Sequence, residues 1–132
     1  MKAVAVLDLA GFTRSLETWE RDAVISAIEE LHTQAEEAAL AHAGRIVGGA
    51  ADTVIALLPD VPAALAYCCR VITALGGRVS AGVGWGELEL THVGWMGLEL
   101  NRASRLGEDV AGPGELRLTK AAQSALNTAR PE

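Results

Sequence analysis

Two aspartates lie at the ends of predicted strands, where a carboxylate can bind a divalent cation. The first, Asp8, stands near the end of the apolar stretch 3–9, and Gly11 follows it as a residue suited to a tight turn. The predicted helix start beyond this turn would offer free backbone N–H groups, which suit phosphates. A strand-end aspartate is also a common helix cap, so Asp8 alone leaves a purely structural role open.

The second aspartate, Asp52, belongs to a predicted hairpin. Residues 48–52 read as a tight turn between a strand that begins at 45–47 and a strand over 53–58. Aspartate is common in β-turns, so Asp52 alone also has a structural explanation. As a pair, however, neighbouring carboxylates form a site for Mg²⁺ or Mn²⁺, which prefer oxygen ligands and share them with substrate phosphates. Two such cations can clamp a phosphoryl group.

Asn101 and Arg105 are four residues apart in a predicted helix over 97–106, so they share one helix face. An arginine can neutralise the charge that develops on phosphorus oxygens during phosphoryl chemistry. An ordinary polar face is the alternative, and within one small domain Arg105 need not reach the two aspartates. His32 and His42 have no second ligand at metal spacing, and we expect them at the surface or its boundary.

Hydrophobic periodicity and turn residues predict the elements that position these side chains. Strands are predicted at 3–9, 45–47, 53–58, 78–90 and 115–118, helices at 13–43, 61–75, 97–106 and 120–126, and a loop at 91–96. Glycines 84 and 86 indicate a bulge or a close backbone approach within the fourth strand region. The order βαββαβ followed by αβα predicts an α+β fold, with a ferredoxin-like core, a C-terminal addition and an antiparallel-type sheet covered by helices. In this arrangement Asp8 and Asp52 end close together.

Composition sets the remaining expectations. With 132 residues, half of them hydrophobic, we expect one globular domain over residues 1–132. A net charge of -6 argues against a nucleic-acid surface. No apolar run approaches the ~20 residues that span a bilayer. Cys68 and Cys69 are adjacent in a helical pattern, which fits neither a disulfide framework nor a metal site. We therefore expect a reduced, cytoplasmic protein that binds neither nucleic acid nor membrane.

Taken in order, these motifs resemble those of the class III adenylate/guanylate cyclase catalytic domain. Four segments carry the resemblance, namely residues 8–13 (DLAGFT), 44–54 (GRIVGGAADTV), 83–87 (VGWGE) and 97–106 (GLELNRASRL). The resemblance extends over residues 3–126 and implies a short, partly divergent member of the family. The implied activity is conversion of ATP or GTP to the 3′,5′-cyclic monophosphate and pyrophosphate, in signal transduction.

The resemblance also implies a role for each matched residue. Asp8 and Asp52 would hold two divalent cations, Mg²⁺ or Mn²⁺, and the following phosphate-binding loop would comprise Leu9, Ala10, Gly11, Phe12 and Thr13. Asn101 would orient the ribose, and Arg105 would stabilise the transition state. In the family these last two residues come from the other subunit. A head-to-tail homodimer that binds a nucleoside triphosphate at its interface is therefore implied.

Several positions depart from the family pattern. The two residues that normally select the purine are replaced by Gly48 and Gly94, so the choice between ATP and GTP stays open. The phosphate-binding lysine of a C-terminal hairpin has no match, because Lys120 comes too early in the pattern. We expect Trp85 and Trp95 to pack in the protein or to be buried at a dimer interface. The more specific alternative is that Trp95 stacks on a nucleotide base.

These departures motivate two alternatives to an enzyme. One is a catalytically degenerate cyclase-like module for dimerisation or for binding a nucleotide or another ligand. The other is an unrelated ferredoxin-like dimer. An active cyclase is the preferred interpretation because all four implied metal and catalytic residues occur together.

Overall fold

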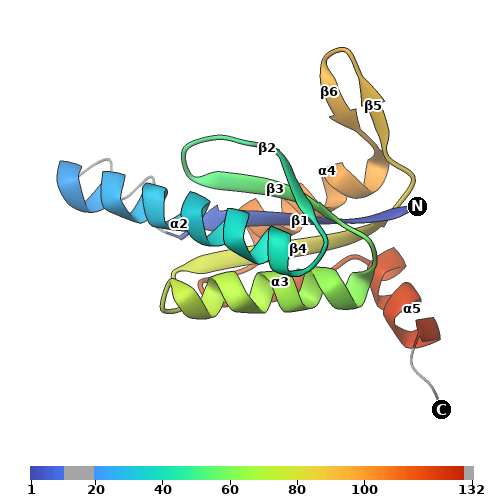
Figure 1. Ribbon diagram of the computed structural model, residues 1–132. Helices are drawn as coiled ribbons and strands as arrows, with labels where there is room; N and C mark the ends of the chain where they lie inside the picture. Colours follow the sequence, from blue (N-terminus) through green and yellow to red (C-terminus); the bar gives the residue numbers. More distant parts are fainter. Residues whose placement is uncertain (11–19, 130–132) are drawn as a thin grey trace.

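The computed structural model describes residues 1–10 and 20–129 (Figure 1). Its elements are β1 (Lys2–Leu9), α2 (Arg21–Ala41), β2 (Arg45–Gly49), β3 (Thr53–Leu58), α3 (Val61–Ala74), β4 (Val79–Gly86), β5 (Glu89–Thr91), β6 (Gly94–Met96), α4 (Leu98–Arg105), the π-helical turn η1 (Leu106–Val110), β7 (Leu116–Leu118) and α5 (Lys120–Ala129). One sheet has the strand order β2-β3-β1-β4-β7, and β5 pairs with β6 in a separate hairpin. Only β7 joins the sheet in parallel, beside β4. The predicted α+β architecture is confirmed.

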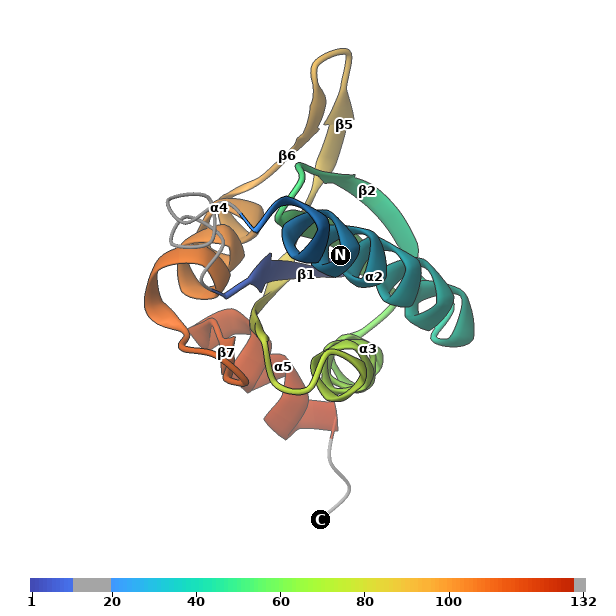
Figure 2. The same ribbon diagram turned by 90° about the vertical axis from the view of Figure 1, so that its left-hand side faces the viewer.

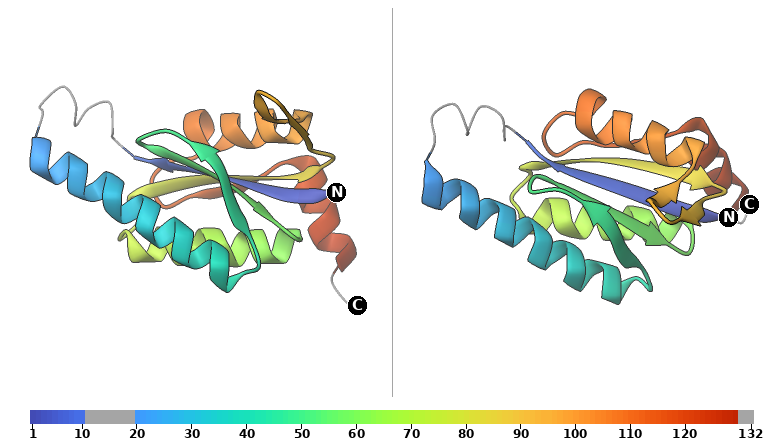
Figure 3. Two further views of the ribbon diagram at one scale, coloured as in Figure 1. Left: turned by 45° about the horizontal axis from the view of Figure 1, so that its top comes forward. Right: turned by 90° about the horizontal axis from the view of Figure 1, so that it is seen from above.

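The central strand β1 separates two layers of side chains. Ala3, Ala5 and Leu7 belong to the large core that includes residues of α2 and α3, whereas Val4 and Val6 cluster with Ala103 of α4. Figure 3 shows the same division, with α2 and α3 on one side of the sheet and α4 on the other. Since side chains alternate along a strand, Asp8 lies on the α4 side.

Glycines on one side of β4 allow α4 to approach the sheet closely. A Cβ atom on Gly82 would collide with the Ala103 carbonyl oxygen, and one on Gly84 would lie 2.7 Å from the Glu99 carbonyl oxygen. The strand is continuous through Gly86, which pairs with Lys2. Of the two predicted explanations for these glycines, close backbone approach is therefore the right one.

Two predicted elements differ from the structure. The helix predicted over 13–43 is not continuous, because the backbone of Glu20 has φ -81° and ψ 79°, outside the helical region, and α2 begins at Arg21. The start of the predicted helix, at residue 13, lies outside the described residues. The predicted loop 91–96 instead contains β6, and Thr91 pairs with Gly94 across a tight turn. Gly94 has φ +120°, a conformation that favours glycine. Figure 2 shows this hairpin projecting from the body of the protein.

The first prediction concerns Gly82. We expect Gly82→Ala to lower the free energy of unfolding by about 1–3 kcal/mol, the usual cost of overpacking, because the new methyl group must push α4 away from β4. Urea denaturation followed by circular dichroism measures this change. Gly48→Ala is the matched control, since a Cβ atom at that strand glycine would meet only Ile55 Cδ1 at 3.8 Å. Equal stability of the two variants would contradict the proposed close contact.

Candidate active site

A row of three polar side chains crosses the sheet at the end of β1. The strand register places Asp8 opposite Thr53 of β3 and opposite Ser80 of β4. The Thr53 hydroxyl donates a hydrogen bond to Asp8 Oδ1 at 3.2 Å, and the Ser80 hydroxyl donates to the Gly107 carbonyl oxygen at 2.7 Å. The row is on the α4 side of the sheet, where Gly107 and Glu108 of η1 lie next to Ser80 and Thr53.

Other carboxylates gather around Asp8. The backbone N–H of Leu9 donates to the Asp52 carbonyl oxygen at 2.8 Å, which ties the end of β1 to the β2–β3 turn. Glu108 of η1 reaches the same place, with its Oε1 atom 3.5 Å from the Thr53 hydroxyl. The structure therefore brings together Asp8 and Asp52, as the sequence predicts, and adds Glu108. We call these three residues the carboxylate group.

The pKa values of Asp8 and Glu108 reflect burial and the charges of neighbouring carboxylates. The pKa of Asp8 is raised to about 6, first by burial and then by the charges of Asp52, Glu108 and Asp109, although the Thr53 hydrogen bond opposes the shift. Burial, with the charges of Asp109 and Asp52, also raises the pKa of Glu108. A cation bound between these carboxylates would relieve both effects.

The donor set fits Mg²⁺ or Mn²⁺, which are commonly held by one or two protein carboxylates together with substrate phosphates and water. Across residues 1–10 and 20–129, no three His, Cys, Asp or Glu side chains are arranged as a metal site. Asp8 and Asp52 would therefore need phosphate or water oxygens to complete the coordination of a cation.

The predicted phosphate-binding loop is described only in part. The N–H groups of Leu9 and Ala10 already donate to the carbonyl oxygens of Asp52 and Arg78, at 2.8 and 2.7 Å. Gly11, Phe12 and Thr13 lie outside the described residues. The role of this loop stays a prediction.

Asn101 and Arg105 lie on α4 as predicted, but they line different pockets. Asn101 lines a pocket of about 650 Å³ together with residues of the segment before β5 and of β6. Arg105 lines a second pocket, of about 430 Å³, next to β7 and the start of α5. Among the described residues lining these pockets, neither Asp8 nor Asp52 is present.

A buried carboxylate holds α4 in place. The Glu99 carboxylate accepts three hydrogen bonds. The donors are the backbone N–H of Trp85 at 3.1 Å, the Thr119 hydroxyl at 2.5 Å and the Arg102 guanidinium at 3.1 Å. Burial alone would raise the pKa of Glu99, but these donors and the Arg102 charge lower it. The sequence reasoning missed Glu99, because its spacing on α4 does not distinguish it from a solvent-exposed acid.

His32 was expected at the surface or its boundary rather than as a metal ligand, and it lies at the boundary. Its side chain is half-buried, and Nε2 lies 3.0 and 3.1 Å from the carbonyl oxygens of Ala50 and Ala51. These carbonyls can only accept, so Nε2 carries the hydrogen. The side chain of His32 thus holds the turn that precedes Asp52, a contact that sequence spacing does not reveal.

Trp85 and Trp95 pack against the rest of the protein, as expected. Trp85 contacts the large core, and Trp95 contacts the cluster on the α4 side. The Arg45 guanidinium lies 5.3 Å from the centre of the Trp95 ring, so a cation covers one ring face. The stacking of Trp95 on a base stays a prediction. At Gly48 and Gly94 the structure offers no side chain that could read a purine.

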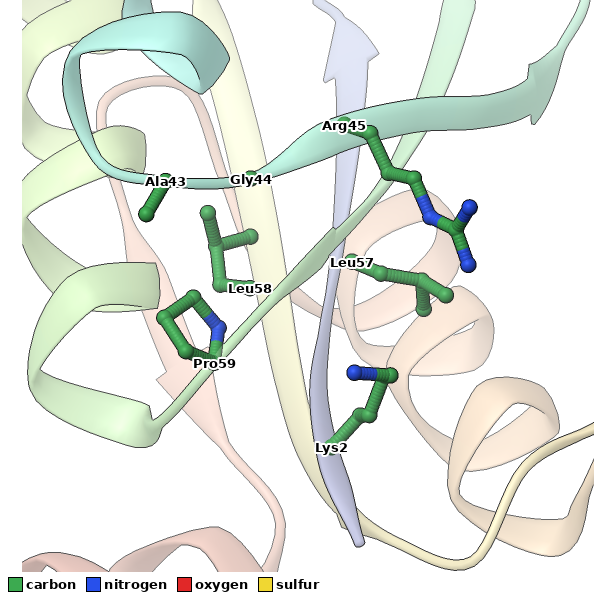
Figure 4. A pocket seen from close by; sticks show the side chains of 7 residues that line it. All are labelled: Lys2, Ala43, Gly44, Arg45, Leu57, Leu58 and Pro59. Carbon is green, nitrogen blue, oxygen red and sulfur yellow. The ribbon is translucent and has the colours of Figure 1, made fainter.

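A further pocket lies away from the carboxylate group. It has a volume of about 140 Å³, and Lys2 and Arg45 contribute cationic side chains to it (Figure 4). Lys2 begins β1, whereas Asp8 stands near the other end of that strand. This pocket is therefore separate from the candidate active site.

The comparisons with known proteins point to one fold. No family model and no curated protein matches the chain. The catalytic core of a rhodopsin-guanylyl cyclase with converted specificity, in complex with ATPαS, matches with a TM-score of 0.79 and 16% identity, over 95% of this chain and 79% of that chain. A non-canonical dimeric guanylyl cyclase domain from the aquatic fungus Blastocladiella emersonii matches with a TM-score of 0.73 and 14% identity, over 97% and 85%.

A bacterial light-regulated adenylyl cyclase also matches, with a TM-score of 0.69 and 16% identity, over 80% of this chain. The match spans 38% of the length of that larger enzyme. The chain therefore has the fold of adenylyl and guanylyl cyclase catalytic domains. Over the described residues, every helix is too short or too polar to cross a membrane.

The second prediction uses the raised pKa of Asp8. Below pH 3.8 the carboxyl is protonated in both folded and unfolded chains, but between about pH 4 and 6 only the folded chain retains the proton. Above pH 6 the ionised Asp8 carboxylate therefore lowers the free energy of unfolding. Without divalent cations, we expect Asp8→Asn to have a higher Tm than the natural chain at pH 7.5, and the difference to vanish near pH 3.5. A difference that is constant from pH 3.5 to 7.5 would contradict the raised pKa of Asp8.

The third prediction concerns Glu99. We expect Glu99→Ala to lower the free energy of unfolding by about 1–3 kcal/mol, because it leaves the buried Thr119 hydroxyl and the Trp85 N–H without their acceptor. Chemical denaturation measures the loss, and Glu37→Ala on the exposed face of α2 serves as the control. If both variants were as stable as the natural chain, Glu99 would not hold α4.

Proposed function

We propose that this chain is a nucleotidyl cyclase that acts as a head-to-tail homodimer on a nucleoside triphosphate. The observation that carries the proposal is the convergence of Asp8 and Asp52 at one end of a sheet that has the cyclase fold. Repulsion among the carboxylates makes this place suited to a divalent cation. The exposed Arg105 on α4 supplies the complementary charge for a phosphoryl group.

The reaction would join the ribose 3′-oxygen to the α-phosphorus and break the bond between this phosphorus and the β-phosphate oxygen. Pyrophosphate leaves, and the hydroxyl proton passes to solvent. Bound Mg²⁺ or Mn²⁺ would favour the ionised hydroxyl and neutralise phosphate charge. Asp8 and Asp52 would hold the cations, with Asp8 oriented by the hydrogen bond from the Thr53 hydroxyl. Asn101 orients the ribose, and Arg105 donates to the α-phosphate oxygens in the transition state.

In this proposal a second copy of the chain supplies Asn101 and Arg105, and the pockets that these residues line contain neither Asp8 nor Asp52, which supports it. Exposed apolar side chains next to the Asn101 pocket support an interface there. They are Leu90, Val93, Met96 and Leu98, each with at least 55% of its surface exposed. In a head-to-tail dimer, α4 of one subunit would face the carboxylate group of the other.

One set of observations favours a second candidate, a module that binds a ligand without turnover. Gly48 and Gly94 provide no hydrogen bonds for a purine, and Arg45 covers one face of Trp95. In that case a nucleoside triphosphate would raise the Tm by mass action, but no cyclic product would form.

The fourth prediction tests both catalysis and the dimer. With Mn²⁺ and ATP or GTP, we expect the natural chain to release cyclic nucleotide and the single variants Asp8→Ala and Arg105→Ala to be inactive. Mixing these two variants should restore about a quarter of the natural activity, because half of the dimers are mixed and each contains one intact site. Activity is measured by chromatography of the cyclic product.

The control is a mixture of Asp8→Ala with Asp52→Ala, which should stay inactive because both changes affect the same half of the site. No product from the natural chain would contradict the cyclase proposal. Full activity of Arg105→Ala alone, or no recovery on mixing, would contradict the shared site.

A further inference from the structure

The pocket drawn in Figure 4 combines positive charge with apolar surface at the corner of the sheet where β2 begins and β3 ends. Its two charged lining residues are Lys2 and Arg45, and the others are Ala43, Gly44, Leu57, Leu58 and Pro59. The described residues that line it include no carboxylate, although the chain has a net charge of -6. The pocket is therefore a local reversal of the overall charge.

The strand register places an apolar side chain between the two cations. Leu57 of β3 pairs with Arg45 of β2 on one side and with Val4 of β1 on the other. Lys2 lies two residues before Val4, so its side chain is on the same side of the sheet. Figure 4 shows the Leu57 side chain between those of Lys2 and Arg45. A molecule in this pocket would contact a hydrocarbon surface with a positive charge on each side.

The Arg45 side chain is held in place but keeps its hydrogen-bond donors. Its guanidinium lies 5.3 Å from the centre of the Trp95 ring, and a stacked guanidinium directs its N–H groups outward in its own plane. Across residues 1–10 and 20–129, neither Arg45 nor Lys2 forms an ion pair with a carboxylate. Glu36 lines a neighbouring pocket with Arg45 without pairing to it. A held arginine loses less conformational entropy when it binds an anion.

We propose that this Lys2–Arg45 pocket binds a small organic carboxylate of about six non-hydrogen atoms. The planar guanidinium matches a carboxylate through two parallel N–H donors, and the Lys2 ammonium contributes a second charge. The hydrocarbon part of the ligand lies against Leu57 and is removed from water. The volume of about 140 Å³ is close to the ~150 Å³ of an engineered cavity that holds benzene, a molecule of six carbon atoms.

Titration of the full chain with sodium butyrate, followed by two-dimensional NMR of the backbone amides, tests the pocket. At constant ionic strength we expect saturable shifts of the signals of Gly44, Arg45 and Leu58, which line the pocket. Acetate should bind about tenfold more weakly, because it lacks two methylene groups that butyrate buries. The amine of the same chain length, n-butylamine, carries the opposite charge and should not bind.

Variants of the two cations test the assignment of residues. We expect Arg45→Gln and Lys2→Gln each to weaken butyrate binding about tenfold, the usual effect of losing one charge-assisted contact, and Lys2→Arg to retain it. Arg70→Gln, which removes an exposed arginine of α3, is the charge-matched control and should bind as the natural chain does. The same spectra show whether each variant is folded.

The pocket proposal is overturned if butyrate causes no saturable shifts, or if Arg45→Gln and Arg70→Gln bind it equally well. Inorganic phosphate that binds more tightly than butyrate would overturn the assignment to a carboxylate. An acetylated and amidated glutamate represents the side chain of a partner protein, and its tighter binding would overturn the assignment to a free acid. These outcomes leave the cyclase proposal untouched, because Lys2 begins β1 and Asp8 stands near its other end.

Discussion

The close contact between α4 and the glycine side of β4 is the constraint on which the candidate site depends. Gly82 lets the helix backbone approach the sheet, and Gly107 brings the following turn equally close to β1. This approach places Glu108 over Asp8, while the buried Glu99 anchors the other end of α4. The same helix carries Asn101 and Arg105 on its exposed surface, so one contact positions both kinds of functional side chain.

Charge is divided between two separate parts of the surface. Carboxylates gather where β1 meets the β2–β3 turn, and cations gather between α4 and α5. The carboxylates alone are electrostatically unfavourable, because burial and neighbouring negative charges both disfavour ionised Asp8. A phosphate chain with divalent cations would satisfy both parts at once in a head-to-tail dimer.

Much of the fold could be predicted from local patterns, because strand alternation and helix periodicity are sequence properties. The closeness of Asp8 and Asp52 could be predicted from placing β1 beside the hairpin, whereas the register that puts Thr53 opposite Asp8 could not. The predicted loop at 91–96 was wrong because β5 and β6 are too short for alternation to be recognised. Glu108 was missed because it reaches the site through a π-helical turn, and the group around Arg105 was missed because Lys120 approaches it only in the folded chain.

The most direct test of the central claim is Mn²⁺ binding to the carboxylate group. Electron paramagnetic resonance can count bound Mn²⁺ in the presence of a 3′-deoxynucleoside triphosphate, which binds but cannot cyclise. We expect the natural chain and the surface control Glu37→Gln to bind Mn²⁺ with the nucleotide. Asp8→Asn and Asp52→Asn should each weaken Mn²⁺ binding at least tenfold, as expected on loss of a charged ligand. Equal Mn²⁺ binding by all four proteins would show that Asp8 and Asp52 are not metal ligands.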